Sequence, residues 1–122
     1  MKREDVLKKA EELNQILKTS DEYKAYEEAY AKIKEHAAAG IMVKDFRKKQ
    51  LEIQKKALEG EDVEAGLEEL RKLWEVVSIN PYVRDVIEAE LVFGQLYGEV
   101  MQEIARGIEL LESSIDKENT KD

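Results

Sequence analysis

The chain has 122 residues, of which 43% are hydrophobic and 39% charged, with a formal net charge of −8 and no cysteine. This length fits one domain, and the apolar share is too large for a disordered chain. The acidic excess argues against direct binding to nucleic acid, and the missing cysteines exclude disulfides, thiolate nucleophiles and iron–sulfur clusters held by thiolates. We expect a cytoplasmic protein with no membrane contact, because no segment has the apolar length of a membrane helix or the apolar core of a signal peptide.

The first third of the chain predicts two helices. Residues 4–17 carry apolar side chains every three or four positions, which is the spacing of one helix face. Ser20 is a favourable N-cap for a second helix over residues 21–36. His36, the only histidine, comes at the end of this helix, and we expect it to be a solvent-facing cap rather than a metal ligand or a general base.

The middle of the chain predicts two more helices. Because glycine costs about 1 kcal/mol relative to alanine in a helix, a kink or tight turn is expected in residues 37–40, which end with Gly40. A third helix then follows to residue 57, and Gly60 ends it as a left-handed C-cap. Asp62 begins a fourth helix.

A long helix is predicted after Asn80 and Pro81, which suit the N-cap and the first helical position. Its apolar stripe extends over residues 81–114, which corresponds to about 50 Å of helix. Three glycines inside it predict the close approach of a neighbouring helix: Gly94, Gly98 and Gly107.

The length of this helix exceeds the width of a compact chain of this size. A radius of gyration of about 14 Å corresponds to a width of about 35 Å. A second copy of the chain is the simplest cover for the part of the helix that extends beyond the globule. The sequence therefore predicts an all-α fold: an elongated antiparallel bundle of about five helices that dimerises through helices, with a tetramer left open. It forms a single domain, ordered over about residues 4–115, with a frayed polar tail over residues 116–122.

Aromatic and apolar residues on the second and last helices are candidates for the interface between copies. Base stacking by the tyrosines is disfavoured, because no basic residues alternate with them on the same face. The basic run at residues 47–49 is expected to be solvated helix surface. The candidate interface residues are Tyr23, Tyr26, Tyr30, Phe93, Tyr97, Val100 and Ile104.

Two polar residues, Gln50 and Glu90, interrupt apolar stripes. Such residues commonly fix the register or the oligomeric state at some cost in stability, and the alternative is that both line a ligand pocket. If Glu90 acts on register alone, leucine in its place should raise the melting temperature and make the oligomer less uniform. We expect no catalytic residue, no metal and no cofactor, because no acid–base pair or ligand cluster can be placed.

Several segments together are similar to one known family. They are Ser20-Asp21-Glu22-Tyr23 with Tyr26 and Ala29, Phe46-Arg47-Lys48-Lys49-Gln50, Asn80-Pro81-Tyr82-Val83, and Ala89-Glu90. In this order and spacing they resemble the YlbF/YmcA family of small all-helical bacterial proteins, over about residues 4–112. The resemblance implies a cytoplasmic protein that oligomerises, usually as a dimer, and it brings no catalytic residues. Family members act in the regulation of competence, sporulation and biofilm formation, and some assist ribonuclease Y in processing messenger RNA.

The chain departs from part of this family. Members of the ribonuclease Y complex are associated with iron–sulfur clusters held by cysteine, and this chain has no cysteine. It is more similar to the cysteine-free, YheA-like branch. The sequence thus favours a non-enzymatic regulatory or adaptor protein with an unidentified protein partner, and the alternative is a helical bundle that binds a small molecule or a metal.

Overall fold

The computed structural model describes residues 1–111 and residue 115, and the expected tail at residues 116–122 lies outside this part. The described residues contain helices and no strand, as the sequence predicts. In chain order the helices are α1 (Arg3–Lys18), α2 (Asp21–Lys34), α3 (Ala37–Leu58), α4 (Glu64–Val77) and α5 (Pro81–Ala105).

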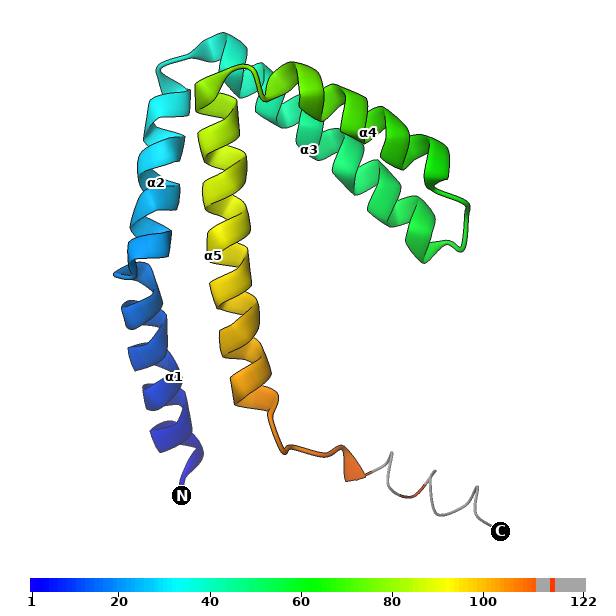
Figure 1. The fold of residues 1–122 in the computed structure, drawn as a ribbon. Coiled ribbons are helices and arrows are strands. Elements are labelled where there is room, and N and C mark those ends of the chain that lie inside the picture. Colours follow the sequence, from blue (N-terminus) through cyan, green and yellow to red (C-terminus); the bar gives the residue numbers. More distant parts are fainter. Residues whose placement is uncertain (112–114, 116–122) are drawn as a thin grey trace.

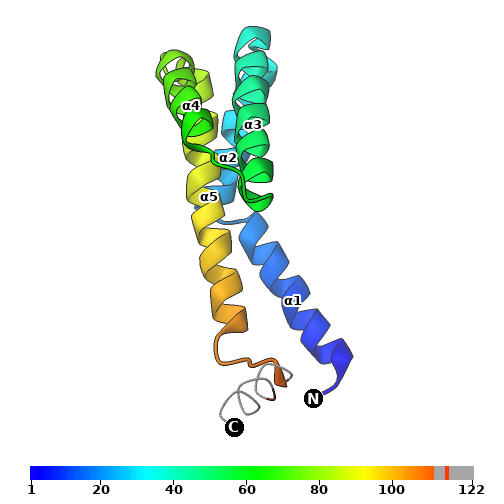
Figure 2. The ribbon, with the colours of Figure 1, turned by 90° about the vertical axis from the view of Figure 1, so that its right-hand side faces the viewer.

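Four of the five helices form two antiparallel pairs that meet at one end (Figure 1). α2 and α5 run side by side in opposite directions, and α1 continues beyond the start of α2. α3 and α4 form a hairpin, the α3–α4 arm, which projects at an angle from the α2–α5 pair. In the view turned by 90°, α1 diverges from the C-terminal half of α5 (Figure 2). The fold is thus open rather than spherical.

Local capping explains where two helices begin. The Ser20 hydroxyl oxygen accepts a hydrogen bond from the Tyr23 amide at 3.1 Å. The Asn80 side-chain oxygen accepts from the amides of Tyr82 at 3.0 Å and Val83 at 3.4 Å. These bonds satisfy amides that have no partner inside the helix, so both predicted N-caps are confirmed.

The hydrophobic core is small and lies where the α3–α4 arm joins α2 and α5. No residue of α1 is buried, and α4 buries only Val77. The buried core residues are Ala29, Ile33, Ala39, Val43, Phe46, Val77, Val83 and Val86. The ends of both pairs therefore extend beyond the core, and much of their apolar surface stays exposed.

The turn between α2 and α3 is displaced from its predicted place. It lies at Glu35 and His36, just before residues 37–40, and Gly40 lies in the first turn of α3. The prediction that His36 faces solvent is wrong, because its ring is half-buried and stacks on Tyr82 with centroids 3.8 Å apart. The stacked rings join the start of α3 to the start of α5.

The end of α5 is the largest departure from the predicted elements. The helix stops at Ala105, so the prediction of a continuous helix through residues 106–111 is wrong, and residues 112–114 lie outside the described part. Gly107 has a φ of +76°, a left-handed conformation that glycine adopts without strain, and the Ile108 amide bonds back to the Ala105 carbonyl at 3.0 Å. With 25 residues, α5 is about 37 Å long rather than 50 Å.

The predicted turn between α3 and α4 is nearly correct. Gly60 follows α3 with a φ of +80°, which confirms the left-handed C-cap. Asp62 lies just before α4 rather than in it, and its side chain accepts a hydrogen bond from the Glu64 amide at 3.0 Å. An acid at this place also suits the positive end of the helix dipole.

The exposed surface is much larger than that of a compact protein of the same size. The chain exposes 10,087 Å², whereas the usual scaling gives about 6,700 Å² for a monomer of 14.1 kDa. Large apolar side chains of α1, α3, α4 and α5 contribute to this surface, among them Val6, Ile41, Leu67, Leu91 and Ile104.

Candidate protein-interaction surface

The aromatic candidates of α2 and α5 contact one another within one chain. Tyr23 lies 5.1 Å from Phe93 between ring centroids, and Tyr26 lies 6.0 Å from Phe93 and 5.0 Å from Tyr30. Edge and offset contacts at such distances stabilise aromatic pairs. Tyr23 and Tyr26 therefore hold α2 against Phe93 of α5, and the role of all four rings between copies stays a prediction.

The stripe continues along α5 beyond this contact. Tyr97 lies 6.3 Å from Phe93 between centroids and is half-exposed. Val100 is half-buried and Ile104 is half-exposed, in the part of α5 from which α1 diverges. These three residues are the members of the predicted interface that a second chain can still reach.

The phenol of Tyr26 is affected by its packing in this cluster. Burial raises the pKa of Tyr26 above its usual value, and the neighbouring phenol of Tyr30 raises it further. Both effects favour the neutral phenol, which fits a side chain packed between α2 and α5.

An ion pair between Arg47 and Glu90 connects α3 to α5. Arg47 Nη1 donates to Glu90 Oε1 at 2.6 Å, and the guanidinium carbon lies 5.8 Å from the centroid of the Tyr30 ring. The Arg47 side chain is 28% exposed, so its predicted place in a solvated basic run is wrong. The signal in the sequence is that Arg47 lies one turn after the apolar Val43, on the same face of the helix.

Gln50 and Glu90 lie together, although they are 40 positions apart in the sequence. Both line a groove of about 640 Å³ between the α3–α4 arm and α5, which we call the arm groove. Its apolar walls come from three helices, and Phe46 and Trp74 contact each other there with centroids 5.5 Å apart. The full lining is Phe46, Gln50, Trp74, Ile87, Glu90, Leu91, Gly94 and Gln95.

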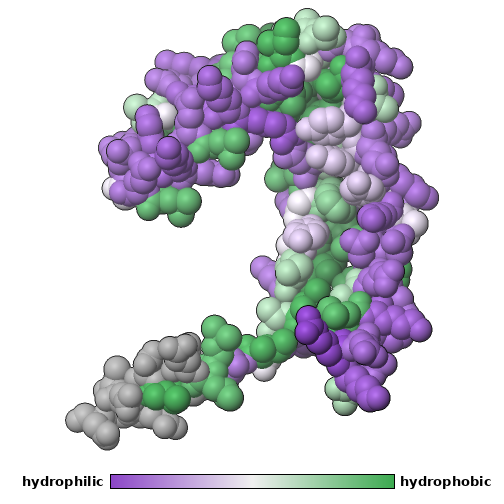
Figure 3. Space-filling model, turned by 180° about the vertical axis from the view of Figure 1, so that it is seen from behind, coloured by the Kyte–Doolittle hydropathy of each residue, from purple (hydrophilic) through white to green (hydrophobic). Residues whose placement is uncertain are grey.

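Seen from behind, the molecule curves around the open space between the arm and α5 (Figure 3). Apolar and weakly polar side chains face this space along α5, while strongly polar ones cover most of the outer side of the curve. A smaller hollow of about 260 Å³ adjoins the groove and is lined by Tyr26, Glu90, Phe93, Gly94 and Tyr97. The Arg47–Glu90 pair therefore lies where the aromatic cluster and the arm groove meet.

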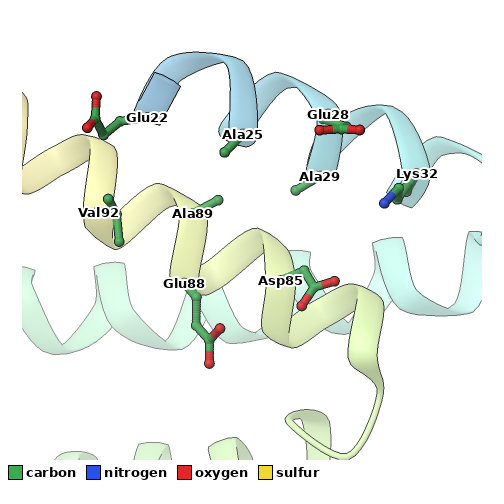
Figure 4. A pocket seen from close by; sticks show the side chains of 9 residues that line it. All are labelled: Glu22, Ala25, Glu28, Ala29, Lys32, Asp85, Glu88, Ala89 and Val92. Carbon is green, nitrogen blue, oxygen red and sulfur yellow. The ribbon is translucent and has the colours of Figure 1, made fainter. Parts of the chain in front are cut away.

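A different cleft of about 340 Å³ lies between α2 and α5 (Figure 4). Small side chains, Ala25, Ala29 and Ala89, lie between the helices, and the labelled carboxylates of Glu28 and Glu88 point in different directions. Among residues 1–111 and 115, no group of three or more histidine, aspartate or glutamate side chains is placed to hold a metal ion. The geometry of this cleft thus reflects close helix packing.

No helix within the described ranges is both long enough and apolar enough to cross a membrane.

The comparison with known proteins gives a consistent result. A family model described as "Control of competence regulator ComK, YlbF/YmcA" matches residues 6–109. A UPF0342 protein of Caldicellulosiruptor bescii is 34% identical over 101 residues, covering 82% of this chain and 85% of that protein. A UPF0342 protein of Staphylococcus saprophyticus is 34% identical, and the match covers 82% of this chain and 89% of that protein. A UPF0342 protein of Symbiobacterium thermophilum is also 34% identical, and the match covers 83% of this chain and 91% of that protein. No solved structure matches the chain.

The matched residues include all four segments that carry the resemblance, from Ser20 to Glu90, as well as the arm groove and the Arg47–Glu90 ion pair. The chain belongs to the YlbF/YmcA family, whose description links it to regulation of competence.

Proposed function

We propose that this protein is a non-enzymatic regulatory adaptor, which associates with a second copy of itself and binds another protein through its exposed helix faces. The observation that carries this proposal is the large exposed surface, about 3,400 Å² more than a compact monomer of this mass exposes. Large apolar side chains on four of the five helices, α1, α3, α4 and α5, contribute to it. Association removes such surface from water and stabilises the complex.

The family description supports a regulatory role in competence. The resemblance extends this proposal to sporulation, biofilm formation and the processing of messenger RNA in the cytoplasm. With a net charge of −8, the protein would act there through a protein partner rather than by direct contact with RNA.

Sedimentation equilibrium at micromolar concentration tests self-association. The chain weighs 14.1 kDa, so a dimer is expected at about twice that mass. A well-folded species at the mass of one chain would refute the proposal, and a species at four times that mass would identify a tetramer.

Crosslinking in native cells, followed by purification, tests the adaptor role. Wild-type protein should retain one stoichiometric protein partner, and Leu67→Glu should lose it, because Leu67 is an apolar side chain that is 51% exposed on α4 and lies outside the lining of the arm groove. The control is Glu27→Ala on the exposed side of α2, which should retain the partner. Equal recovery with both variants would exclude the exposed face of α4 as the partner site.

A second candidate function is the binding of a small molecule in the arm groove. Its volume of about 640 Å³ lies within the usual range for ligand sites, and Gln50, Glu90 and Gln95 supply a few polar groups among apolar walls. Native mass spectrometry of freshly purified protein tests this function: extra mass that disappears on denaturation supports it, and a bare polypeptide mass contradicts it.

A further inference from the structure

α5 carries a second apolar face, which lines the arm groove in its first half and is mostly exposed in its second half. Its residues alternate in steps of four and three, which is the heptad spacing of helices that pack along their length. We call this face the α5 seam. It consists of Ile87, Leu91, Gly94, Gly98, Met101 and Ala105.

The seam is open to a partner. Leu91 is 61% exposed and Met101 is 46% exposed. At Gly94 and at Gly98, an added Cβ would meet no atom within 4 Å. The aromatic stripe of Phe93 and Tyr97 lies beside the seam rather than on it, because the centres of the two stripes differ by about 100° around the helix.

The seam and the arm groove form one continuous surface. Ile87, Leu91 and Gly94 line the groove, whereas Gly98, Met101 and Ala105 extend past it along the free half of α5. One half of the seam thus forms a wall of a hollow, and the other half is a protruding apolar helix. The two halves are of nearly equal length.

We propose that the arm groove is completed by a second copy of this chain, whose α5 packs antiparallel on the seam. With the two-fold axis at Gly98, Leu91 lies opposite Ala105 of the other copy, because each is seven residues from the axis. The free half of each α5 then enters the arm groove of the other copy, and Met101 and Ala105 become part of its lining.

Three observations favour this occupant and this direction. The two halves of the seam complement each other, which a two-fold axis requires of an interface between identical surfaces. A parallel arrangement would instead place the two arms at the same end and leave both grooves without an occupant. Gly94 and Gly98 leave space on the helix surface, so that the two backbones can approach closely at the centre.

The area also fits. A stable interface buries about 800 Å² on each partner, and this chain exposes about 3,400 Å² more than a compact monomer. With the axis at Gly98, the two α5 helices pair from Leu91 to Ala105, which is about 21 Å or four turns of each helix. The inference rests on the self-association proposed above and adds the face, the direction and the residues that each copy contributes.

Single cysteines test the arrangement, because the natural chain has none and any disulfide must join two copies. Under mild oxidation, Gly98→Cys should form a covalent dimer nearly completely, since a disulfide needs Cα atoms within about 7 Å. An equal mixture of Leu91→Cys and Ala105→Cys should form the mixed dimer, and each variant alone should crosslink weakly. The matched control is Glu88→Cys, on the α2 side of α5, which should stay uncrosslinked.

The outcomes separate this inference from the proposed function. A dimer in sedimentation with no crosslink at Gly98 and none between positions 91 and 105 would overturn the antiparallel seam while leaving self-association intact. A monomer in sedimentation would overturn both. Leu91→Glu gives an independent readout: its helix content by circular dichroism should be unchanged, and its dimer should dissociate at a concentration higher by about a hundredfold or more.

Discussion

Replacing Glu90 with leucine should lower the melting temperature, because it leaves Arg47 without its partner. Losing one partner costs about 3–5 kcal/mol when an ion pair is buried and about 0–1 kcal/mol when it is exposed. The Arg47 and Glu90 side chains are 28% and 38% exposed, which places this pair between the two limits. We expect a loss of about 1.5 kcal/mol, or about 6 °C for a chain of this length.

A double-mutant cycle measures the interaction directly. The four proteins are the wild type, Glu90→Leu, Arg47→Met and the variant with both changes, melted at one fixed concentration because association affects stability. Methionine keeps an unbranched apolar stem in place of arginine. The double variant should recover about 1 kcal/mol relative to the sum of the single changes, since no partly buried charge is left unpaired.

The matched control is Glu88→Leu on the same helix, because the structure gives Glu88 no ion pair among the described residues. It should change stability by no more than about 0.5 kcal/mol. If Glu90→Leu melts at or above the wild-type temperature, or if the two single changes simply add, the ion pair contributes nothing and the reasoning fails. A rise is what a role in register alone predicts, so the same melt distinguishes the two interpretations of Glu90.

Three further predictions concern other parts of the fold. Phe46→Ala should cost about 3–4 kcal/mol in urea unfolding, because Phe46 is buried and contacts Trp74 of the arm; an effect below 1 kcal/mol would contradict its place in the core. Gly60→Ala should cost about 1 kcal/mol in the same assay, since alanine is strained at a φ of +80°, whereas Gly94→Ala should be neutral or stabilising in a single chain. The raised pKa of Tyr26 means that the folded state holds this proton more tightly than the unfolded state does, so stability should fall as the pH rises from about 10 to the folded pKa. Tyr26→Phe should lose that part of the alkaline decline in melts at successive pH values, and an unchanged decline would exclude Tyr26 as its source.

Helix starts could be predicted from the sequence because they depend on local contacts. The Ser20 and Asn80 side chains bond amides two or three residues later, so the residues themselves contain the signal. The turn at Gly60 is predictable for the same reason. In each case a short stretch of chain supplies both the group that needs a partner and the partner.

The end of α5 could not be predicted in this way. Gly94, Gly98 and Gly107 are alike in a stripe of apolar residues, yet only Gly107 takes a positive φ and ends the helix. Gly94 and Gly98 keep the helical backbone conformation inside α5, whereas Gly107 lies two residues after the last helical residue. The spacing of the apolar residues continues through this break, because Ile108 lies four residues after Ile104. The spacing therefore does not show where the helix ends.

The candidate site was predictable only in part. Gln50 and Glu90 are recognisable as polar positions on apolar stripes, and the structure places both in the arm groove. The partner of Glu90 was missed because Arg47 is 43 residues away and resembles its solvated neighbour Lys48. Which of two adjacent cations faces inward depends on the rotation of α3 about its own axis, and the core at the junction of α3 and α5 sets this rotation.

The expected dimer now depends on a different physical argument. At about 37 Å, α5 is hardly longer than the width of about 35 Å expected of a compact chain, so its length alone no longer requires a second copy. The open angle between the arm and α5 supplies the reason instead, because it exposes apolar side chains that a globule would bury. Two glycines in the middle of α5 also cost about 1 kcal/mol each relative to alanine, and no contact within the described chain explains them. A helix of a second copy, packed where their missing side chains leave room, accounts for both features at once.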